Sequence, residues 1–153
     1  MGNEILELLN DGAAVKILVT ADETGAPHPV VKDSLRFEDG KIIYFEFCEA
    51  SRSNRNMTNA LWFDKKAVIL LLASDKRSFN ITAKPARCVI NTKVFQRYYE
   101  EAREKYGFDL SSAWILEPLE ITEHSLGFRV EQESRARSYF NHLDRLAGKE
   151  VTA

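Results

Sequence analysis

The stretch AVKILVTADETGAPHPVVKDSLRFEDGKIIYFEFCEASRSNRNM, residues 14–57, decides the fold. It holds three segments, at 14–21, 29–37 and 41–47, in which β-branched and aromatic residues are frequent, as is typical of strands. Asp, Glu, Gly and Pro residues at 22–27 and 38–40 predict tight turns between them. The stretch therefore predicts antiparallel strands that lead into the polar cluster Ser51–Met57.

That cluster reads Ser-Arg-Ser-Asn-Arg-Asn-Met and follows the third strand directly. Guanidinium groups match the oxygens of a phosphate, and hydroxyls, amides and the free N–H groups of a following helix can complete such a site. A phosphorylated cofactor is the functional interpretation. The same composition is also common in solvated turns that precede a helix, so the residues alone leave both interpretations open.

The rest of the chain continues the β pattern. Residues 67–73 (AVILLLA) are apolar throughout, which predicts a strand buried on both faces near the centre of a sheet. Residues 78–90 alternate but contain Pro85, which marks an edge strand or a bulge. Residues 113–122 and 126–132 are predicted to form two final strands.

Four segments have helical spacing. They are a lid helix at 3–10, a short helix at 56–63, a helix at 93–106 that Gly107 ends, and a C-terminal helix at 135–146. Many short strands with few helices predict a mainly β, α+β fold, an antiparallel barrel with peripheral helices. A chain of 153 residues fits one domain, 1–153.

Composition excludes several classes of protein. The net charge is −2 and both signs are interspersed, so the basic stripe of a nucleic-acid binder is missing. Neither cysteine, Cys48 or Cys88, has a second Cys or a His at ligand spacing, which predicts small strand or core residues and neither a disulfide nor a metal site. The N-terminus lacks the pattern of a signal peptide and no run is long enough to span a bilayer, so we expect a soluble cytoplasmic protein that binds no membrane.

Several strings, in order, resemble the split-barrel family of FMN-binding proteins that includes pyridoxamine 5′-phosphate oxidase. The resemblance covers about residues 5 to 130. The matching strings are ILVTADETGAPH at 17–28, IIYFEF at 42–47 followed by Ser51-Arg52, Arg55-Asn56-Met57, ITAKPAR at 81–87 and LEPLEIT at 116–122.

The resemblance implies an antiparallel split β-barrel that binds FMN, with the phosphate held where the third strand meets the next helix. It places the following residues at the cofactor: Lys32, Ser34, Glu46, Phe47, Ser51, Arg52, Ser53, Arg55 and Asn56. Strand parity puts Lys32 and Ser34 on one face, so both face the cofactor or neither does. The chain departs from the family pattern at Ser53, where a phosphate-binding Lys is usual, at Ser34, where the oxidase has a basic residue, and at Lys84, which replaces a Gly. Arg52 and Arg55 would then hold the phosphate, with help from the hydroxyls of Ser51 and Ser53.

The resemblance also implies a homodimer with the cofactor at the subunit interface, and a flavin-dependent oxidoreductase of unknown substrate. A noncatalytic module of the same fold, which holds flavin or haem for sensing, storage or protection, is the alternative. No catalytic residue can be assigned, because the three histidines, His28, His124 and His142, are dispersed and the chain has no nucleophile elbow.

Overall fold

The computed structural model describes residues 2–137. Its elements, in chain order, are α1 (Asn3–Leu6), η1 (Glu7–Asn10), β1 (Val15–Ala21), β2 (Pro27–Val31), β3 (Arg36–Glu38), β4 (Lys41–Glu46), α2 (Arg52–Trp62), β5 (Ala67–Leu72), β6 (Ser78–Val89), α3 (Lys93–Tyr106), β7 (Ser112–Glu123) and α4 (Leu126–Ala136). The seven strands form one antiparallel sheet in the order β2-β1-β5-β6-β7-β4-β3. The fold is therefore the predicted mainly β, α+β class.

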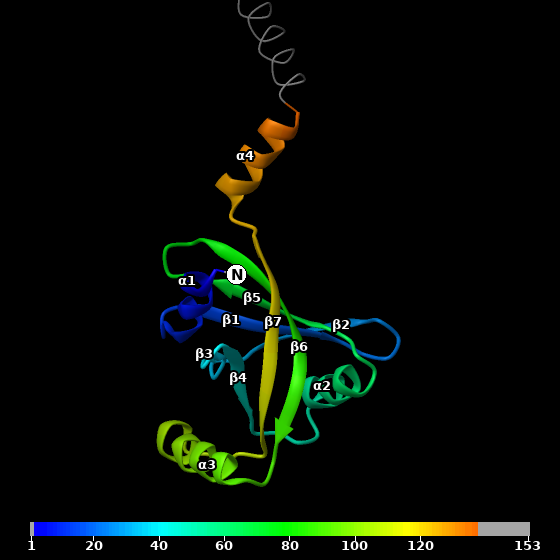
Figure 1. The fold of residues 1–153 in the computed structure, drawn as a ribbon, viewed down its shortest axis with the longest axis vertical. Coiled ribbons are helices and arrows are strands. Elements are labelled where there is room, and N and C mark those ends of the chain that lie inside the picture. Colours follow the sequence, from blue (N-terminus) through cyan, green and yellow to red (C-terminus); the bar gives the residue numbers. More distant parts are fainter. Residues whose placement is uncertain (1, 138–153) are drawn as a thin grey trace, which may run out of the picture.

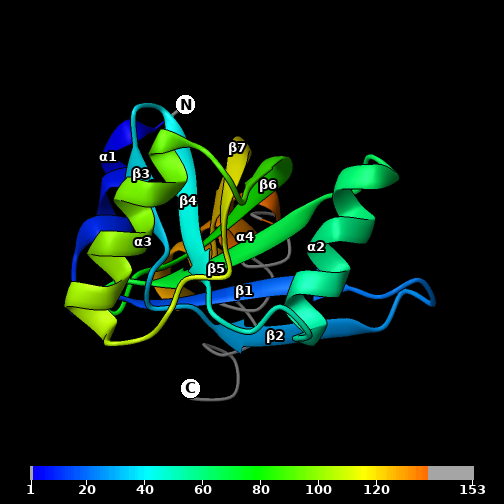
Figure 2. The ribbon, with the colours of Figure 1, turned by 90° about the horizontal axis from the view of Figure 1, so that it is seen from below.

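The connection between β2 and β3 shows that this sheet curls. The two strands are the opposite edges of the sheet, yet only residues 32–35 separate them. Six steps of about 4.8 Å between neighbouring strands would put the edges of a flat sheet roughly 29 Å apart. The five steps from Val31 to Arg36 reach at most about 18 Å. The edges must therefore approach each other, which makes the sheet a barrel (Figures 1 and 2).

The prediction of a single strand at 29–37 is wrong, because the chain turns at residues 32–35 to connect the two edges of the sheet. Residues 32–35 form a turn in which the Leu35 N–H donates to the Lys32 carbonyl at 3.1 Å. The chain before the turn pairs with β1, and the chain after it pairs with β4. One predicted strand is thus two short strands that join the two edges of the barrel.

Strand β6 contains the bulge that Pro85 predicted, but it is not an edge strand. Its register against β7 shifts between Thr82 and Ala83 and again between Pro85 and Arg87. The pairing with β5 ends at Ala83, so no strand lies beside Pro85 on that side. The backbone N–H that proline lacks is therefore not needed there. The proline is therefore tolerated in the middle strand of the sheet.

Helices cover the barrel at two places, with α2 and α3 on either side of the strands in Figure 2. Helix α3 begins and ends as predicted: the Thr92 hydroxyl accepts from the Phe95 N–H, and Gly107 takes a left-handed conformation. The main core fills the barrel and includes Trp114 and Tyr44. A second apolar cluster lies under α3. Within residues 2–137, no helix is both long and apolar enough to cross a membrane.

Two further predictions need correction, and one lies mostly outside the described residues. Residues 126–132 belong to helix α4, which projects from the end of β7 in Figure 1 and carries ion pairs one helical turn apart, Glu131–Arg135 and Glu133–Arg137. The C-terminal helix predicted at 135–146 lies mostly outside the described residues. Cys48 is not a strand or core residue but an exposed loop residue; Cys88 is a half-buried residue of β6, as predicted.

Candidate functional site

The polar cluster at 51–57 is the beginning of a helix and not an open turn. Ser51 has extended backbone angles, and its Oγ accepts a hydrogen bond from the Asn54 N–H at 3.0 Å. This is the geometry of a helix N-cap, so α2 starts at Arg52, four residues earlier than the predicted helix. The polar side chains are therefore distributed around the first two turns of a helix.

Helical periodicity divides this cluster into two sides. Ser53, Asn56 and Met57 are buried against the barrel, whereas Arg52 and Arg55 are exposed. The buried Asn56 side chain donates to the Thr20 hydroxyl of β1 at 3.0 Å. Asn56 thus connects α2 to the sheet, which makes it a structural residue at the edge of the site.

A carboxylate lies at the centre of the buried side. Glu46, the last residue of β4, is 2% exposed. Its Oε1 accepts from the hydroxyls of Ser51 at 2.8 Å and Ser53 at 3.1 Å. The Lys32 ammonium lies 3.3 Å from Oε1 and 3.2 Å from Oε2. A longer contact of 3.4 Å joins Oε2 to the Cys48 N–H. Two of the groups predicted to hold a phosphate, the hydroxyls of Ser51 and Ser53, therefore converge with Lys32 on an anion that belongs to the protein.

Lys32 and Ser34 reach different partners. Both lie in the turn between β2 and β3, so the parity argument, which assumed one continuous strand, does not apply. Lys32 points to Glu46 and lies 5.4 Å from the centre of the Tyr44 ring. The Ser34 hydroxyl accepts from the Phe45 N–H at 2.9 Å. Ser34 therefore fastens the turn to β4.

Phe47 points away from this carboxylate. Its ring lies 5.5 Å from that of Tyr106 and 6.1 Å from that of Phe108, centre to centre. These contacts place it in the second apolar cluster, under α3. Two of the predicted site residues, Phe47 and Ser34, thus make their contacts with other groups and not with the Glu46 carboxylate.

The exposed side of α2 faces the turn between β1 and β2. Arg52, Arg55 and Asn56 line a pocket there together with Asp22 and Glu23. Within residues 2–137, the guanidiniums of Arg52 and Arg55 form no hydrogen bond and no ion pair. The pKa of the Asp22 carboxyl is lowered, chiefly because the Thr24 hydroxyl donates to it and to a smaller extent because Arg52 is near. Two uncommitted cations, three residues apart on one helix, are therefore available to an anion.

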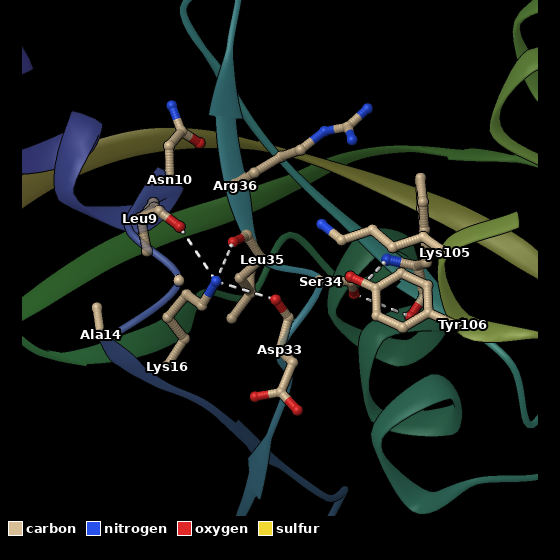
Figure 3. Close-up of a pocket in the computed structure, with 12 residues that line it drawn as sticks. Leu9, Asn10, Ala14, Lys16, Asp33, Ser34, Leu35, Arg36, Lys105 and Tyr106 are labelled. Carbon is tan, nitrogen blue, oxygen red and sulfur yellow. Dashed lines mark hydrogen bonds between the residues drawn. The ribbon is translucent and has the colours of Figure 1, made fainter. Parts of the chain in front are cut away.

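The largest departure from the predicted pattern is Lys16, which the motif comparison missed. It is 7% exposed, and its ammonium donates to the carbonyls of Leu9 at 3.1 Å, Asp33 at 2.9 Å and Leu35 at 3.1 Å, as Figure 3 shows. Burial lowers the pKa of this amine. A pocket of about 400 Å³ adjoins it. The sequence held one signal of this burial: Lys16 lies two residues before Leu18 on the same strand, so both side chains point to the inner face of the sheet.

Lys16 holds three chain segments together. Lys16 itself lies in β1, and its carbonyl partners belong to η1 and to the turn of residues 32–35 between β2 and β3. All three ammonium hydrogens are used by these carbonyls. The residue therefore fixes the turn that closes the barrel and has no hydrogen left to offer a ligand.

The described residues offer no metal site and no assigned catalytic group. Among residues 2–137, no group of three or more His, Cys, Asp or Glu side chains gathers at ligand spacing. Burial raises the pKa of the Cys88 thiol and that of the Tyr44 phenol. Both groups are therefore held in their protonated forms, which are poor nucleophiles.

Comparison with solved structures identifies relatives in fold. An FMN-binding protein from Syntrophomonas wolfei superposes with a TM-score of 0.64 at 20% identity, over 81% of this chain and 88% of that one. HupZ from Group A Streptococcus gives 0.65 at 16% identity, over 82% and 95%. HutZ, a haem storage protein from Vibrio cholerae, gives 0.57 at 13% identity, over 80% and 93%.

Comparisons of sequence alone found nothing comparable. No family model matches the chain. No curated protein matches it either. At identities of 20% and below, the superpositions establish the architecture and leave the ligand open. The chain has the split-barrel fold shared by FMN-binding and pyridoxamine 5′-phosphate oxidase-like proteins, as its sequence motifs predicted.

Proposed function

We propose that this chain is a single-domain FMN-binding protein that holds the cofactor phosphate with Arg52 and Arg55 and acts as an oxidoreductase. The observation that carries the proposal is the pair of uncommitted guanidiniums on the first turns of α2. Arginine presents a planar set of donors that suits phosphate, and the N-terminus of a helix favours negative charge. The FMN-binding neighbour in the structural comparison supports the choice of ligand.

The two sides of α2 differ in how well they fit a phosphate. On the buried side, Lys32, Ser51 and Ser53 already donate to Glu46, whose charge would repel a phosphate. On the exposed side, the guanidiniums have no such partner. Asp22 and Glu23 line the same pocket and reduce its positive potential, but the Asp22 carboxylate is engaged by the Thr24 hydroxyl and N–H and by the Ala26 N–H. The phosphate therefore fits Arg52 and Arg55 and does not fit the Ser51 and Ser53 hydroxyls.

A bound flavin would supply the capacity to accept and donate electrons, and the protein would bind and orient it. In this proposal Arg52 and Arg55 bind the phosphate. Ser51 holds the helix start in place, and Asn56 fixes the helix to β1 through Thr20. No side chain has to form a covalent intermediate, in agreement with the protonated states of Cys88 and Tyr44.

The first test is the absorption spectrum of the purified protein, with chemical identification of any ligand released on denaturation. The proposal expects a flavin spectrum, or its appearance on reconstitution with FMN. No flavin binding in titration would refute it, and a haem spectrum would favour the storage alternative. If flavin binds, its reduction by a nicotinamide followed by turnover on an acceptor supports the enzyme, whereas a flavin that no donor reduces supports the noncatalytic module.

The second test compares FMN with riboflavin, which lacks the phosphate. If Arg52 and Arg55 bind the phosphate, the Arg52→Ala, Arg55→Ala double variant loses most of its preference for FMN and keeps its affinity for riboflavin. Arg97→Ala is the matched control, because it removes an exposed arginine from α3. A preference for FMN that survives in the double variant would place the phosphate elsewhere.

We also propose that the protein is a homodimer with the cofactor at the subunit interface, because one face of the sheet is apolar where water would be expected. On β1 and β5, successive cross-strand pairs on the outward parity are Val15 with Leu72, Ile17 with Leu70, and Val19 with Val68. Val15 is 42% exposed and Leu72 is 41% exposed. An antiparallel sheet with one solvated face normally alternates apolar and polar residues.

This face continues onto β2. Val31, 54% exposed, lies opposite Ile17, and Pro29 lies opposite Val19. The run at 67–73 is therefore apolar at every position although only alternate residues enter the core. A second copy of the chain is the occupant that this aliphatic face suits, since a twofold interface places like surfaces together.

Leu72→Glu tests the interface at a residue that is already partly exposed, so the fold of the monomer should tolerate it. Each substitution acts twice in a twofold interface. We therefore expect the dissociation constant of the dimer to rise at least about tenfold over that of the wild type. Val94→Glu, on the exposed side of α3, is the control. Light scattering through a dilution series measures the change. Flavin should be lost as the dimer dissociates, and a monomer that binds flavin at full stoichiometry would refute the shared site.

A further inference from the structure

The Glu46 carboxylate has the environment of a bound anion. Its side chain is 3% exposed, and that of its partner Lys32 is 13% exposed. Four donors reach its two oxygens: the Lys32 ammonium, the hydroxyls of Ser51 and Ser53, and the Cys48 N–H. A carboxylate that accepts several such bonds is strongly held in its position.

These donors come from three separate segments of the chain. Lys32 belongs to the turn that closes the barrel, Cys48 to the loop after β4, and Ser51 and Ser53 to the start of α2. Hydroxyls at a helix start, a cation and a backbone N–H that converge on one point are groups that also bind phosphate. Here the charge of Lys32 is matched by that of Glu46, so the set is neutral and each of its donors already has an acceptor.

We propose that Glu46 is a resident anion that occupies this donor set and excludes phosphate from it. A phosphate brought to these donors would meet a buried carboxylate a few ångströms away, where low dielectric strengthens repulsion between like charges. The consequence for ligand choice is specific: the phosphate of any ligand is directed to the exposed side of α2. Removal of the Glu46 carboxylate should turn the same donors into a site for inorganic phosphate.

The experiment titrates inorganic phosphate into the wild type and into Glu46→Ala, and follows the backbone N–H signals of Cys48 and Ser53 by nuclear magnetic resonance. The expected result is a saturable shift of both signals in Glu46→Ala and none in the wild type. Phosphate should also raise the melting temperature of Glu46→Ala more than that of the wild type, because a ligand that binds only the folded state stabilises it.

Glu49→Ala is the matched control. It removes an equal charge from the loop after β4, three residues from Glu46, and the Glu49 side chain makes no hydrogen bond or ion pair within residues 2–137. This variant should behave as the wild type does. Phosphate-dependent shifts at Cys48 and Ser53 in the wild type would overturn the proposal, as would their absence in a folded Glu46→Ala protein.

Glu46→Gln keeps the proposal testable if Glu46→Ala does not fold. The amide retains the shape and one acceptor oxygen while it removes the charge. The expected phosphate affinity lies between those of the wild type and Glu46→Ala, and an affinity equal to that of the wild type would overturn the role of the charge.

The inference uses the proposed function only for the identity of the natural ligand. In the same variants, the ratio of FMN to riboflavin affinity should rise on loss of the Glu46 carboxylate, since a negative charge that repels the phosphate is removed. If no variant binds flavin, the proposed function fails while the phosphate titration still decides the role of Glu46. If flavin binds and phosphate never reaches Cys48 and Ser53, the inference alone fails.

Discussion

The two sides of helix α2 carry polar residues from one short sequence and use them in opposite ways. On the buried side, Ser53 and the capping Ser51 donate to Glu46, and Lys32 completes the charge balance. On the exposed side, Arg52 and Arg55 keep their guanidiniums for solvent or a ligand. Residue types suited to phosphate therefore define a site only where their donor hydrogens have no acceptor within the protein. A donor that an internal acceptor already uses is part of the scaffold.

The largest expected effect is on the buried side. Glu46→Ala leaves the Lys32 ammonium partly buried without its partner, and removal of one member of a buried ion pair typically costs about 3 kcal/mol or more. We expect urea denaturation to show a loss of about 3 kcal/mol in the free energy of unfolding. Lys32→Met in the same chain should recover part of the loss.

A double-mutant cycle of Glu46 and Lys32 separates the pair from its surroundings. Glu49→Ala serves again as the control and should change stability little. If Glu46→Ala and Glu49→Ala had equal stabilities, the converging donors would contribute nothing, and the distinction between the two sides of α2 would fail.

The exposed side should respond in ligand affinity and not in stability. Arg52→Ala is expected to weaken FMN binding by about 2 kcal/mol, roughly thirtyfold, because hydrogen bonds to charged groups contribute in the range of about 1.5–3 kcal/mol. The melting temperature of the ligand-free protein should be unchanged, since the guanidinium has no partner to lose. Fluorescence titration with FMN measures the affinity, and an unchanged value for Arg52→Ala would assign the phosphate to Arg55 or to another group.

The smallest effect distinguishes the two serines. Both hydroxyls donate to Glu46, but only Ser51 also accepts from the Asn54 N–H as the helix cap. Ser51→Ala should therefore be more destabilising than Ser53→Ala by about 1 kcal/mol, the usual contribution of an N-cap. Ser51→Asn, which can still cap, should recover much of that difference in urea denaturation. Equal stabilities of the two alanine variants would indicate that the cap is dispensable.

Much of the fold was predictable because it depends on local signals. The apolar run at 67–73 and the helix at 93–106, with its Gly107 terminator, were placed to within about a residue. The segment at 126–132 was not, because Leu126, Phe128 and Val130 alternate as in a strand while Leu126 and Val130 also fit one face of a helix. Short segments satisfy both periods, and the exposed ion pairs beyond residue 130, one helical turn apart, favour the helix only slightly.

The candidate site was predictable in some of its residues and not in its connections. The motif comparison selected Lys32, Glu46, Ser51 and Ser53, which the structure brings together. It could not show that Glu46 accepts hydrogen bonds from the other three, because the partners come from segments up to 21 residues apart in a chain of 153. Lys16 was missed because its partners are backbone carbonyls, which no side-chain motif records.

The two tryptophans provide an optical reporter that needs no label. Trp114 is 1% exposed, and its indole N–H donates to the Asn54 side chain at 2.9 Å, within the first turns of α2. Trp62, at the far end of the same helix, is 79% exposed. A Trp62→Phe protein therefore emits from a single indole that is hydrogen-bonded beside Ser53. Its emission wavelength and quenching should respond to any rearrangement at the start of α2. Ligand binding at this helix could therefore be followed by intrinsic fluorescence.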